Sequence, residues 1–319
     1  MKSSKAREII ERAMEDRAVY AAMAARESEV WGKILPALEH SEARAADARS
    51  SASLRIGRHM GSLIEIAKQK GLHFKHGLTL GCGAGRLERT LLEQGICERF
   101  HGIDISAQAV ADAQETSERD GLPITYEVGD LNFIVLPKNA FDLVVAQTSL
   151  HHILFLERVA EQISGALEHT GYLWIHDFIG ETQGQYDSKR LSLLNQLLSI
   201  LPEKFRTNKI NGRVTARIER PEPGRLGSPF EKIRSEEIVP VFENWFTIEW
   251  RKEFTSLLHL IAPPGTRAAF TENEDTRALF EVLILLDHLC IEEGILQPIG
   301  GQYLMRPKAS ALSPGRGPT

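Results

Sequence analysis

Three glycines at every second position form the clearest chemical motif in this 319-residue chain. Gly81, Gly83 and Gly85 directly follow the short apolar run 78–80 and precede a helical pattern. Glycine tolerates positive φ angles and lets a ligand approach the backbone closely. A helix that begins after such a loop also directs free N–H groups and a positive dipole end toward the ligand. The stretch therefore predicts a strand–loop–helix cradle for a small polar ligand.

Two aspartates follow the next two predicted strands. Asp104 comes directly after the strand expected at 100–103, and Asp130 follows the strand expected at 124–128. In a doubly wound sheet, ligands bind outside the carboxyl ends of the strands. An acid after the second strand is placed to accept hydrogen bonds from both hydroxyls of a ribose, and one after the third can accept from the exocyclic amine of an adenine. Together the two acids predict an adenosine-containing ligand.

The glycine spacing distinguishes between two adenosine cofactors. A nicotinamide dinucleotide favours Gly-x-Gly-x-x-Gly with its pyrophosphate on the helix end, whereas this chain has Gly-x-Gly-x-Gly with Glu88 close behind. A carboxylate in the first turns of that helix would repel a diphosphate but not the zwitterionic amino-acid tail of S-adenosylmethionine. The residues thus favour S-adenosylmethionine over NAD.

Alternating strand and helix patterns must hold these residues at one edge of a sheet. Apolar runs bounded by glycine or aspartate predict the strands, and amphipathic stretches between them predict the helices. Strands are expected at 78–80, 100–103, 124–128, 141–146, 171–176, 246–254 and 301–305, and helices at 85–94, 107–120, 156–167 and 274–293. This rhythm indicates an α/β fold with a doubly wound, mainly parallel, seven-stranded Rossmann-like sheet.

Additional segments flank or interrupt this core. Residues 1–70 have helical patterns and are expected to form an N-terminal helical cap, with the arm of a homodimer as the open alternative. The main domain is expected to span residues 71–308, and within it residues 180–240 break the rhythm as a helical insertion that would act as a lid. Residues 309–319, rich in Ser, Pro and Gly, are expected to be disordered.

Composition and charge exclude several classes of partner. The chain has 38 Lys and Arg against 43 Asp and Glu, so it lacks a global positive field to attract nucleic acid. Its three cysteines suit a reducing compartment. The charged N-terminus does not have the apolar region of a signal peptide, and the most apolar late run, 279–291, is too short to span a bilayer. We expect a cytoplasmic protein with no nucleic-acid or membrane partner.

Four successive segments resemble the motifs of class I S-adenosylmethionine-dependent methyltransferases. They are 80–86, 102–106, 130–132 and 149–152. Later stretches resemble a bacterial group that acts on small molecules or glycans and has a helical insertion after the fifth strand; they include 177–180, 195–206 and 228–238. The resemblance covers roughly residues 75 to 308 and implies S-adenosylmethionine as cofactor, with S-adenosylhomocysteine as product.

The resemblance and the strand ends together imply a set of cofactor-binding residues. They are Gly81, Cys82, Gly83, Gly85, Glu88, Asp104, Ile105, Asp130, Leu131, Asn132 and Gln147. One position departs from the family pattern. Many relatives carry an acid two residues before the first glycine, where it helps to hold the cofactor's amino group, and this chain has Thr79. We expect Glu88 to take over that role.

Two adjacent histidines are the candidate catalytic residues. His151 and His152 follow the fourth strand, at the methyl end of the cofactor in this fold. Histidine titrates near neutral pH, so one of them is expected to act as general base in the methylation of a hydroxyl. Asp177, after the fifth strand, is expected either to orient the acceptor or to cap the insertion. No metal site is expected, because adjacent residues rarely converge on one ion and no third ligand has a telling spacing.

The sequence therefore predicts a methyltransferase that acts on a small-molecule or sugar-containing acceptor, with O-methylation as the favoured reaction. Two alternatives stay open, namely N- or C-methylation of a small metabolite and a non-catalytic subunit that binds S-adenosylmethionine. Residues 204–225 are locally basic, which suits either a solvated loop or contact with an acidic acceptor.

Overall fold

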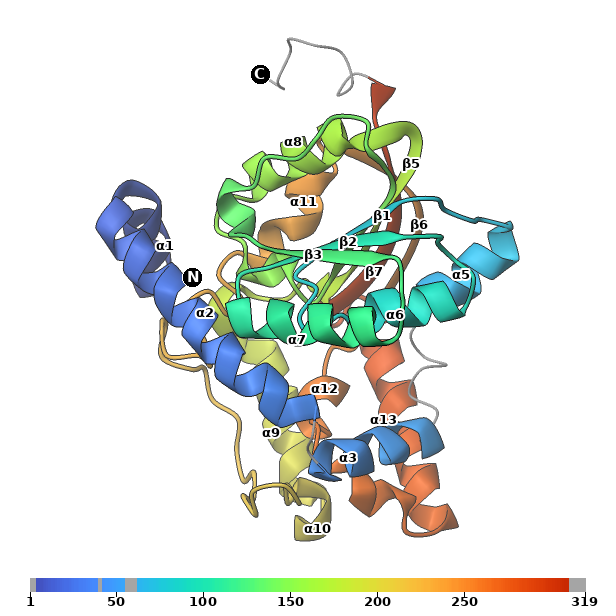
Figure 1. Ribbon diagram of the computed structural model, residues 1–319. Helices are drawn as coiled ribbons and strands as arrows, with labels where there is room; N and C mark the ends of the chain where they lie inside the picture. The colour runs from blue at the N-terminus through green and yellow to red at the C-terminus, as the bar shows by residue number, and fades with distance from the viewer. Residues whose placement is uncertain (1–3, 40–41, 55–61, 310–319) are drawn as a thin grey trace.

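A seven-stranded sheet forms the centre of the computed structural model, which describes residues 4–39, 42–54 and 62–309 (Figure 1). The strands lie in the order β3-β2-β1-β4-β5-β7-β6, and β7 runs antiparallel to both of its neighbours. They are β1 (Gly77–Leu80), β2 (Phe100–Asp104), β3 (Ile124–Val128), β4 (Phe141–Gln147), β5 (Leu167–Phe178), β6 (Phe246–Phe254) and β7 (Gly300–Pro307). The predicted α/β fold with a mainly parallel seven-stranded sheet is confirmed.

Helices cover both faces of this sheet and extend beyond it. In chain order they are α1 (Ser4–Glu15), α2 (Arg17–Glu39), α3 (Glu42–Ser53), α5 (Leu63–Lys70), α6 (Arg86–Glu93), α7 (Ala107–Arg119), α8 (Leu156–Ala166), α9 (Ser188–Ile200), α10 (Glu203–Arg206), α11 (Ile238–Phe242), α12 (Leu258–Ile261) and α13 (Glu274–Glu292). Short 3₁₀-helices are η1 (Leu131–Phe133), η2 (Leu150–His152), η3 (Thr182–Gly184), η4 (Ser235–Glu237) and η5 (Arg267–Thr271). Among the described helices, none combines the length and the apolar character needed to cross a lipid bilayer.

The central strands are apolar along their length because helices cover both of their faces. Val144 of β4 packs into a core that α8 and α11 share with one face of the sheet. The next residue, Val145, packs on the opposite face, in a core that also contains Ile66 of α5 and Leu91 of α6. This alternation fixes the register of β4 between β1 and β5 and brings the carboxyl ends of these strands to one edge.

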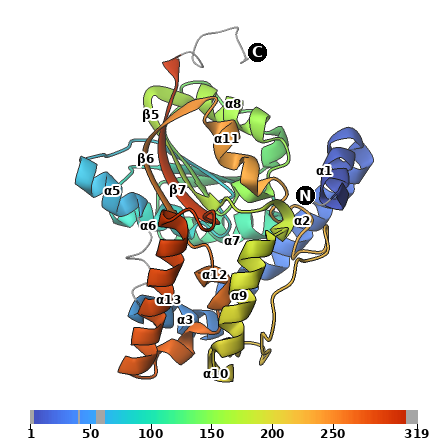
Figure 2. The same cartoon turned by 180° about the vertical axis from the view of Figure 1, so that it is seen from behind.

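Helices from three separate parts of the chain pack together beside the sheet (Figure 2). We call this group, made of α3, α9, α10, α12, η5 and α13, the helical lobe. Its core joins Leu54 next to α3, Leu194 of α9 and Phe280 of α13. The expected insertion at 180–240 contributes only α9 and α10 to the lobe, and between α10 and η4 it runs without α-helix or strand.

Two boundaries differ from the sequence-based expectation. α5 falls within the N-terminal cap expected for residues 1–70, but Leu63 and Ile66 are buried in the same core as Phe100 and Trp174, so α5 belongs to the sheet domain. Residues 255–299, which were not expected to take part in a lid, supply α12, η5 and α13 of the lobe. The expected disordered tail at 309–319 lies, apart from its first residue, outside the described residues.

Helix α2 lies along the carboxyl edge of the sheet. It packs against α7, and the hydroxyl of Ser28 donates a hydrogen bond to the carbonyl oxygen of Ile105, just after β2, at 2.9 Å. The N-terminal segment therefore covers the edge at which the glycine loop and both aspartates lie.

Candidate functional site

The glycine loop after β1 has the backbone that its sequence predicts. Gly81, Gly83 and Gly85 have φ angles of 72°, 53° and 74°, in the region that other residues rarely adopt. A Cβ atom on Gly81 would lie 2.5 Å from the Cβ of Ser149, so the loops after β1 and β4 approach too closely for a larger residue. α6 begins directly after Gly85, and the predicted strand–loop–helix arrangement is confirmed.

Asp104, at the end of β2, holds the glycine loop through its carboxylate. Oδ2 accepts a hydrogen bond from the backbone N–H of Gly83 at 2.9 Å, and Oδ1 accepts one from the N–H of Ser106 at 2.8 Å. Burial raises the pKa of Asp104, although both hydrogen bonds oppose the rise. A carboxylate oxygen can accept more than one hydrogen bond, so Asp104 keeps lone pairs for a ligand in a place shielded from water.

These residues line a cavity of about 150 Å³ at the carboxyl edge of the sheet. Its wall includes most of the predicted cofactor-binding residues, namely Gly81, Gly83, Asp104, Ile105, Asp130, Leu131 and Asn132. The wall does not include Cys82, Gly85, Glu88 or Gln147. Cys82 is buried, and this burial raises the pKa of its thiol, which agrees with a packing role. Gln147 ends β4 in register with His176 of β5.

Glu88 does not lie where the sequence predicts it. It shares the buried face of α6 with Leu91, three residues later, so the helix turns its side chain toward the core and away from the cavity. Neither carboxylate oxygen has a hydrogen-bond partner among the described residues. Burial raises the pKa of Glu88 to about 7, and the neighbouring hydroxyl of Thr79 opposes the rise. Glu88 therefore does not line the cavity, and its expected contact with the cofactor's amino group stays a prediction.

Helix α2 closes the cavity from a direction that no motif indicated. Tyr20, Glu27 and Trp31 lie seven and four residues apart, on one face of the helix, and Glu27 and Trp31 line the cavity. The hydroxyl of Tyr20 donates a hydrogen bond to Oδ2 of Asp130 at 2.7 Å. Burial and the carboxylate of Asp130 both raise the pKa of Tyr20. The helical spacing of these three residues is the signal in the sequence that could have identified this face.

Asp130 and Asn132 support the backbone as well as lining the cavity. Oδ1 of Asp130 accepts a hydrogen bond from the N–H of Asn132 at 3.0 Å. The side-chain oxygen of Asn132 accepts from the backbone N–H groups of Leu154 and Phe155, at 2.8 and 3.0 Å. Asn132, expected as a cofactor ligand, therefore uses its oxygen to fix the chain before α8.

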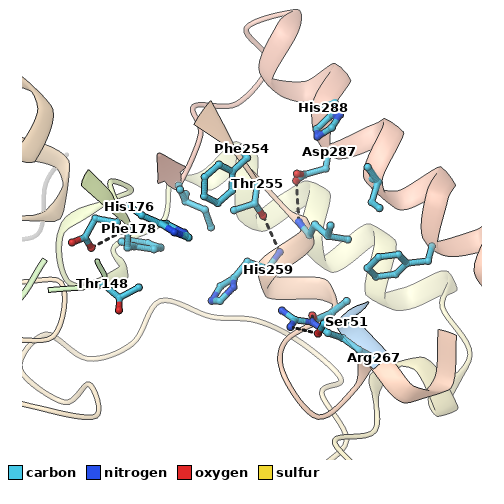
Figure 3. A pocket seen from close by; sticks show the side chains of 17 residues that line it. Ser51, Thr148, His176, Phe178, Phe254, Thr255, His259, Arg267, Asp287 and His288 are labelled. Atoms are coloured by element: carbon cyan, nitrogen blue, oxygen red, sulfur yellow. Dashed lines mark hydrogen bonds between the residues drawn. The ribbon is translucent and has the colours of Figure 1, made fainter. Parts of the chain in front are cut away.

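A second cavity, of about 410 Å³, lies between the sheet edge and the helical lobe (Figure 3). Its wall is largely apolar, with Phe178, Phe254, Phe280 and Ile284 among the lining residues. Thr148, directly after β4, lines both cavities, so the two adjoin at this residue.

Two histidines bring polar groups to the larger cavity. His176 lies on β5 and His259 on α12, and Figure 3 shows both rings among its lining side chains. Burial lowers the pKa of both histidines, that of His259 to about 4, so both rings are neutral at pH 7. Arg267 of η5 adds a cation, and it donates a hydrogen bond to the hydroxyl of Ser51 in α3 at 2.9 Å.

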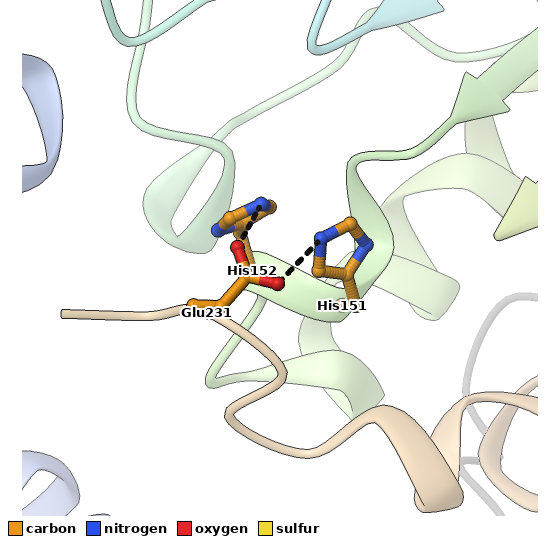
Figure 4. A group of neighbouring side chains, drawn as sticks. All are labelled: His151, His152 and Glu231. Atoms are coloured by element: carbon orange, nitrogen blue, oxygen red, sulfur yellow. Dashed lines mark ion pairs between the residues drawn. The ribbon is translucent and has the colours of Figure 1, made fainter. Parts of the chain in front are cut away.

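The adjacent histidines of η2 both face one carboxylate from the insertion (Figure 4). Nε2 of His151 lies 3.8 Å from Oε1 of Glu231, and Nε2 of His152 lies 3.7 Å from Oε2. The expectation that adjacent histidines would not converge is wrong, because the tight turn of η2 directs both rings toward the same point. Within the described part of the chain, these three residues form the group whose ligand atoms are close enough to hold a metal ion.

Asp177 anchors the turn that carries the histidines. Its Oδ1 lies 2.5 Å from Nδ1 of His151, and its Oδ2 accepts from the backbone N–H groups of Ser149 and Leu150. Burial lowers the pKa of His151, but the carboxylate of Asp177 outweighs this effect, so the pKa is raised. The side chain of Asp177 is 0% exposed. Asp177 thus caps η2. It also lines the larger cavity described above, and its expected role toward an acceptor stays a prediction.

Comparison with known proteins identifies part of the chain. Residues 78–175 match a family model described as a methyltransferase domain. We call this part of the chain, which is similar to a methyltransferase domain over less than half of the full length, the methyltransferase domain. It contains the glycine loop, Asp104, Asp130 and both histidines of η2, whereas Glu27 and Glu231 lie outside it.

Two curated relatives of the methyltransferase domain have names that specify different reactions. The human protein named arginine-hydroxylase NDUFAF5, mitochondrial, is 34% identical over 110 residues, which are 34% of this chain and 30% of that protein. The ubiquinone biosynthesis O-methyltransferase of Coxiella burnetii is 27% identical over 109 residues, 34% of this chain and 46% of that protein. The chain thus matches less than half the length of either relative.

Among solved structures, an S-adenosylmethionine dependent methyltransferase from Mesorhizobium loti is 18% identical, with a TM-score of 0.41 over 78% of this chain and 99% of that one.

The residues of the methyltransferase domain fit S-adenosylmethionine. The cradle around Gly81 and Gly83 presents backbone without side chains to the cavity, as a ligand that lies close to the loop requires. Asp104 retains acceptor sites for ribose hydroxyls. Asp130, which follows β3, lines the same cavity.

Proposed function

We propose that this chain is an S-adenosylmethionine-dependent methyltransferase that methylates a hydroxyl group of a small-molecule acceptor. One observation carries the proposal: the cavity of the glycine loop and the larger cavity adjoin at Thr148. A cofactor held by Gly81, Gly83 and Asp104 would have room for an acceptor beside it, on the side that the helical lobe covers.

The lining of the larger cavity supports an acceptor with an apolar portion. Phe178, Phe254 and Phe280 offer aromatic surface, whereas His176, His259 and Arg267 offer a few hydrogen-bonding groups. Such a mixture is typical of small-molecule sites, in which apolar walls supply affinity and a few polar groups fix orientation. A small aromatic compound or a sugar attached to an apolar group would suit this lining. The name of the Coxiella burnetii relative agrees with transfer to oxygen.

The chain's own residues would align the acceptor and assist loss of its proton. When bound, S-adenosylmethionine supplies an activated methyl group on a sulfonium. Positioning of two reactants can contribute roughly 7–11 kcal/mol to such a displacement. The histidine pair of η2 would assist proton loss, in the simplest form as a general base, because Asp177 orients the ring of His151 through Nδ1 and leaves Nε2 free of a hydrogen bond within 3.5 Å.

Calorimetry followed by a transfer assay tests the proposal. Both S-adenosylmethionine and S-adenosylhomocysteine should bind, and the Asp104→Ala variant should bind each at least about tenfold more weakly. Asp120→Ala, which alters an exposed aspartate at the end of α7, is the matched control and should bind normally. Labelled methyl groups should then pass into a cell extract, and mass spectrometry would identify the methylated oxygen. Binding of NADH without binding of either sulfur ligand would overturn the proposal.

A further inference from the structure

Two imidazole nitrogens and one carboxylate meet in the space between η2 and the insertion. The Nε2 atoms of His151 and His152 lie 3.8 and 3.7 Å from the two oxygens of Glu231, beyond the length of a hydrogen bond. The three ligand atoms nevertheless lie within 4.8 Å of one another. Donors about 2.1 Å from a tetrahedral metal ion are about 3.4 Å apart, so the ligand atoms would have to approach one another by up to about 1.4 Å to complete the geometry.

A second carboxylate lies beside the other nitrogen of each histidine. Nδ1 of His151 lies 2.5 Å from Asp177, and Nδ1 of His152 lies 2.9 Å from Glu27. Histidines that bind metals almost always donate their other ring N–H to a carboxylate or carbonyl, which fixes the tautomer and directs the free nitrogen at the ion. The ring of His151 has this arrangement, whereas Nδ1 of His152 lies at ion-pair distance from Glu27 without a hydrogen bond among the described residues.

The supporting carboxylates are themselves fixed. Glu27 accepts hydrogen bonds from Nε1 of Trp31 at 2.7 Å, from the hydroxyl of Ser228 at 2.9 Å and from the N–H of Phe230 at 3.0 Å. Its position therefore places residue 231 of the insertion next to η2. A site with rigid supports of this kind needs little reorganisation to bind an ion.

The charge around the cluster also calls for a cation. Glu27, Asp177 and Glu231 are acidic, and the nearby Lys232 directs its ammonium over the ring of Phe178, 4.1 Å from the centroid. Imidazoles bind a metal ion in their neutral form, and in that form the three carboxylates and Lys232 leave two negative charges in a largely buried region. One divalent cation would balance these charges.

We propose that His151, His152 and Glu231 bind a divalent transition-metal cation, such as zinc or iron(II). Two imidazoles and one carboxylate form a ligand set that leaves positions open for a further ligand. The inference rests on the proposed function and deepens it, because His152 lines the cavity of the glycine loop together with Thr148, the residue at which the two cavities adjoin. The histidines would then assist proton loss as ligands of the ion.

The step balances without an oxidant. The acceptor oxygen binds the cation, which lowers the pKa of its hydroxyl, and the proton leaves to solvent water. The oxygen's electron pair then forms the bond to the methyl carbon, and the electrons of the methyl–sulfur bond remain on sulfur.

Metal binding by the purified chain tests the inference. The untagged full chain would be dialysed against EDTA, freed of chelator and titrated with CoCl₂, with the visible absorption of Co²⁺ as readout. Parallel dialysis against ZnCl₂ with elemental analysis gives the stoichiometry. We expect about one ion per chain, and the isosteric variant Glu231→Gln should bind at least about tenfold more weakly. His73→Ala removes an exposed histidine that precedes β1 and should bind as the unaltered chain does.

Glu27→Gln provides a second variant that leaves all three ligands in place. Loss of a supporting carboxylate should weaken Co²⁺ binding roughly 10–100-fold. Retention of less than about one ion per ten chains, or equal retention by the Glu231→Gln and His73→Ala variants, would overturn the metal site. If S-adenosylmethionine binds and transfer proceeds equally after chelation, the metal inference fails while the proposed function stands. If neither sulfur ligand binds, the proposed function fails.

Discussion

The hydroxyl of Tyr20 donates a hydrogen bond to Oδ2 of Asp130 at 2.7 Å. The N-terminal helix α2 thus binds the carboxylate that the sequence assigns to an adenine amine. Because Oδ1 of Asp130 already accepts from Asn132, an adenine amine that binds at Oδ2 would share this oxygen with the tyrosine.

Tyr20→Phe should separate these two uses of Asp130. Without a ligand, the variant leaves a partly buried carboxylate oxygen unpaired, and we expect the free energy of unfolding to fall by about 1 kcal/mol. The affinity for S-adenosylmethionine should rise, because Oδ2 of Asp130 is then fully available to the adenine amine. Urea unfolding and calorimetry measure the two effects. A fall in affinity would show instead that the tyrosine supports the ligand directly.

Gly81→Ala should damage both stability and cofactor binding. The new Cβ would meet Ser149 at 2.5 Å in a backbone with φ of 72°. We expect a loss of at least about 2 kcal/mol of folding free energy. Gly95→Ala is the matched control, because Gly95 has φ of 65° and no atom within 4 Å of the added Cβ, and it should lose only about 1 kcal/mol. Equal losses in thermal unfolding would contradict the close approach of the two loops.

Asp177→Asn should lower the pKa of His151. The carboxylate of Asp177 is the cause that raises this pKa against the effect of burial, and an amide cannot replace its charge. NMR titration of the imidazole resonances measures the shift, with exposed His73 as an internal control. In the proposed reaction, turnover should fall while KM changes little, because Asp177 acts through His151. An unchanged His151 titration would remove Asp177 from this role.

Glu88 should make the stability of the protein fall as pH rises. Burial raises its pKa in the folded state to about 7, above its ordinary value of 4.5, so the folded protein binds the proton more tightly than the unfolded chain. Stability is then greatest below about pH 4.5 with respect to this group and decreases up to about pH 7. Glu88→Gln should remove up to about 3 kcal/mol of this dependence. Urea unfolding at pH 5 and pH 8 provides the test, and identical pH dependence in both proteins would refute it.

The parts of the site that the sequence predicts are those fixed by local order along the chain. Asp104 and Asp130 each follow a strand, and parallel pairing of β1, β2 and β3 then brings them to one edge. The glycine loop is local as well. For these residues, position in the chain determines position in the fold.

The rest of the site depends on contacts that no local pattern encodes. Glu27 meets Ser228 across 201 residues, and this contact depends on how α2 and the insertion dock on the sheet. Glu231 reaches the histidines by the same docking. The burial of Glu88 follows from the rotation of α6 about its axis. Because a charged residue is ordinarily expected on the exposed face of a helix, the sequence does not predict this burial. Likewise, the core of the helical lobe is formed by apolar residues from three separate parts of the chain, and no local pattern shows that these parts pack together.

The place of β7 in the sheet has a consequence for solubility. β7 lies between β5 and β6 and pairs with both, although it follows them in the chain. Until residues 300–307 arrive, β5 and β6 each have an edge of unpaired backbone groups, and such edges promote aggregation between chains. The final strand therefore protects the folding protein from self-association during synthesis, in addition to completing the sheet.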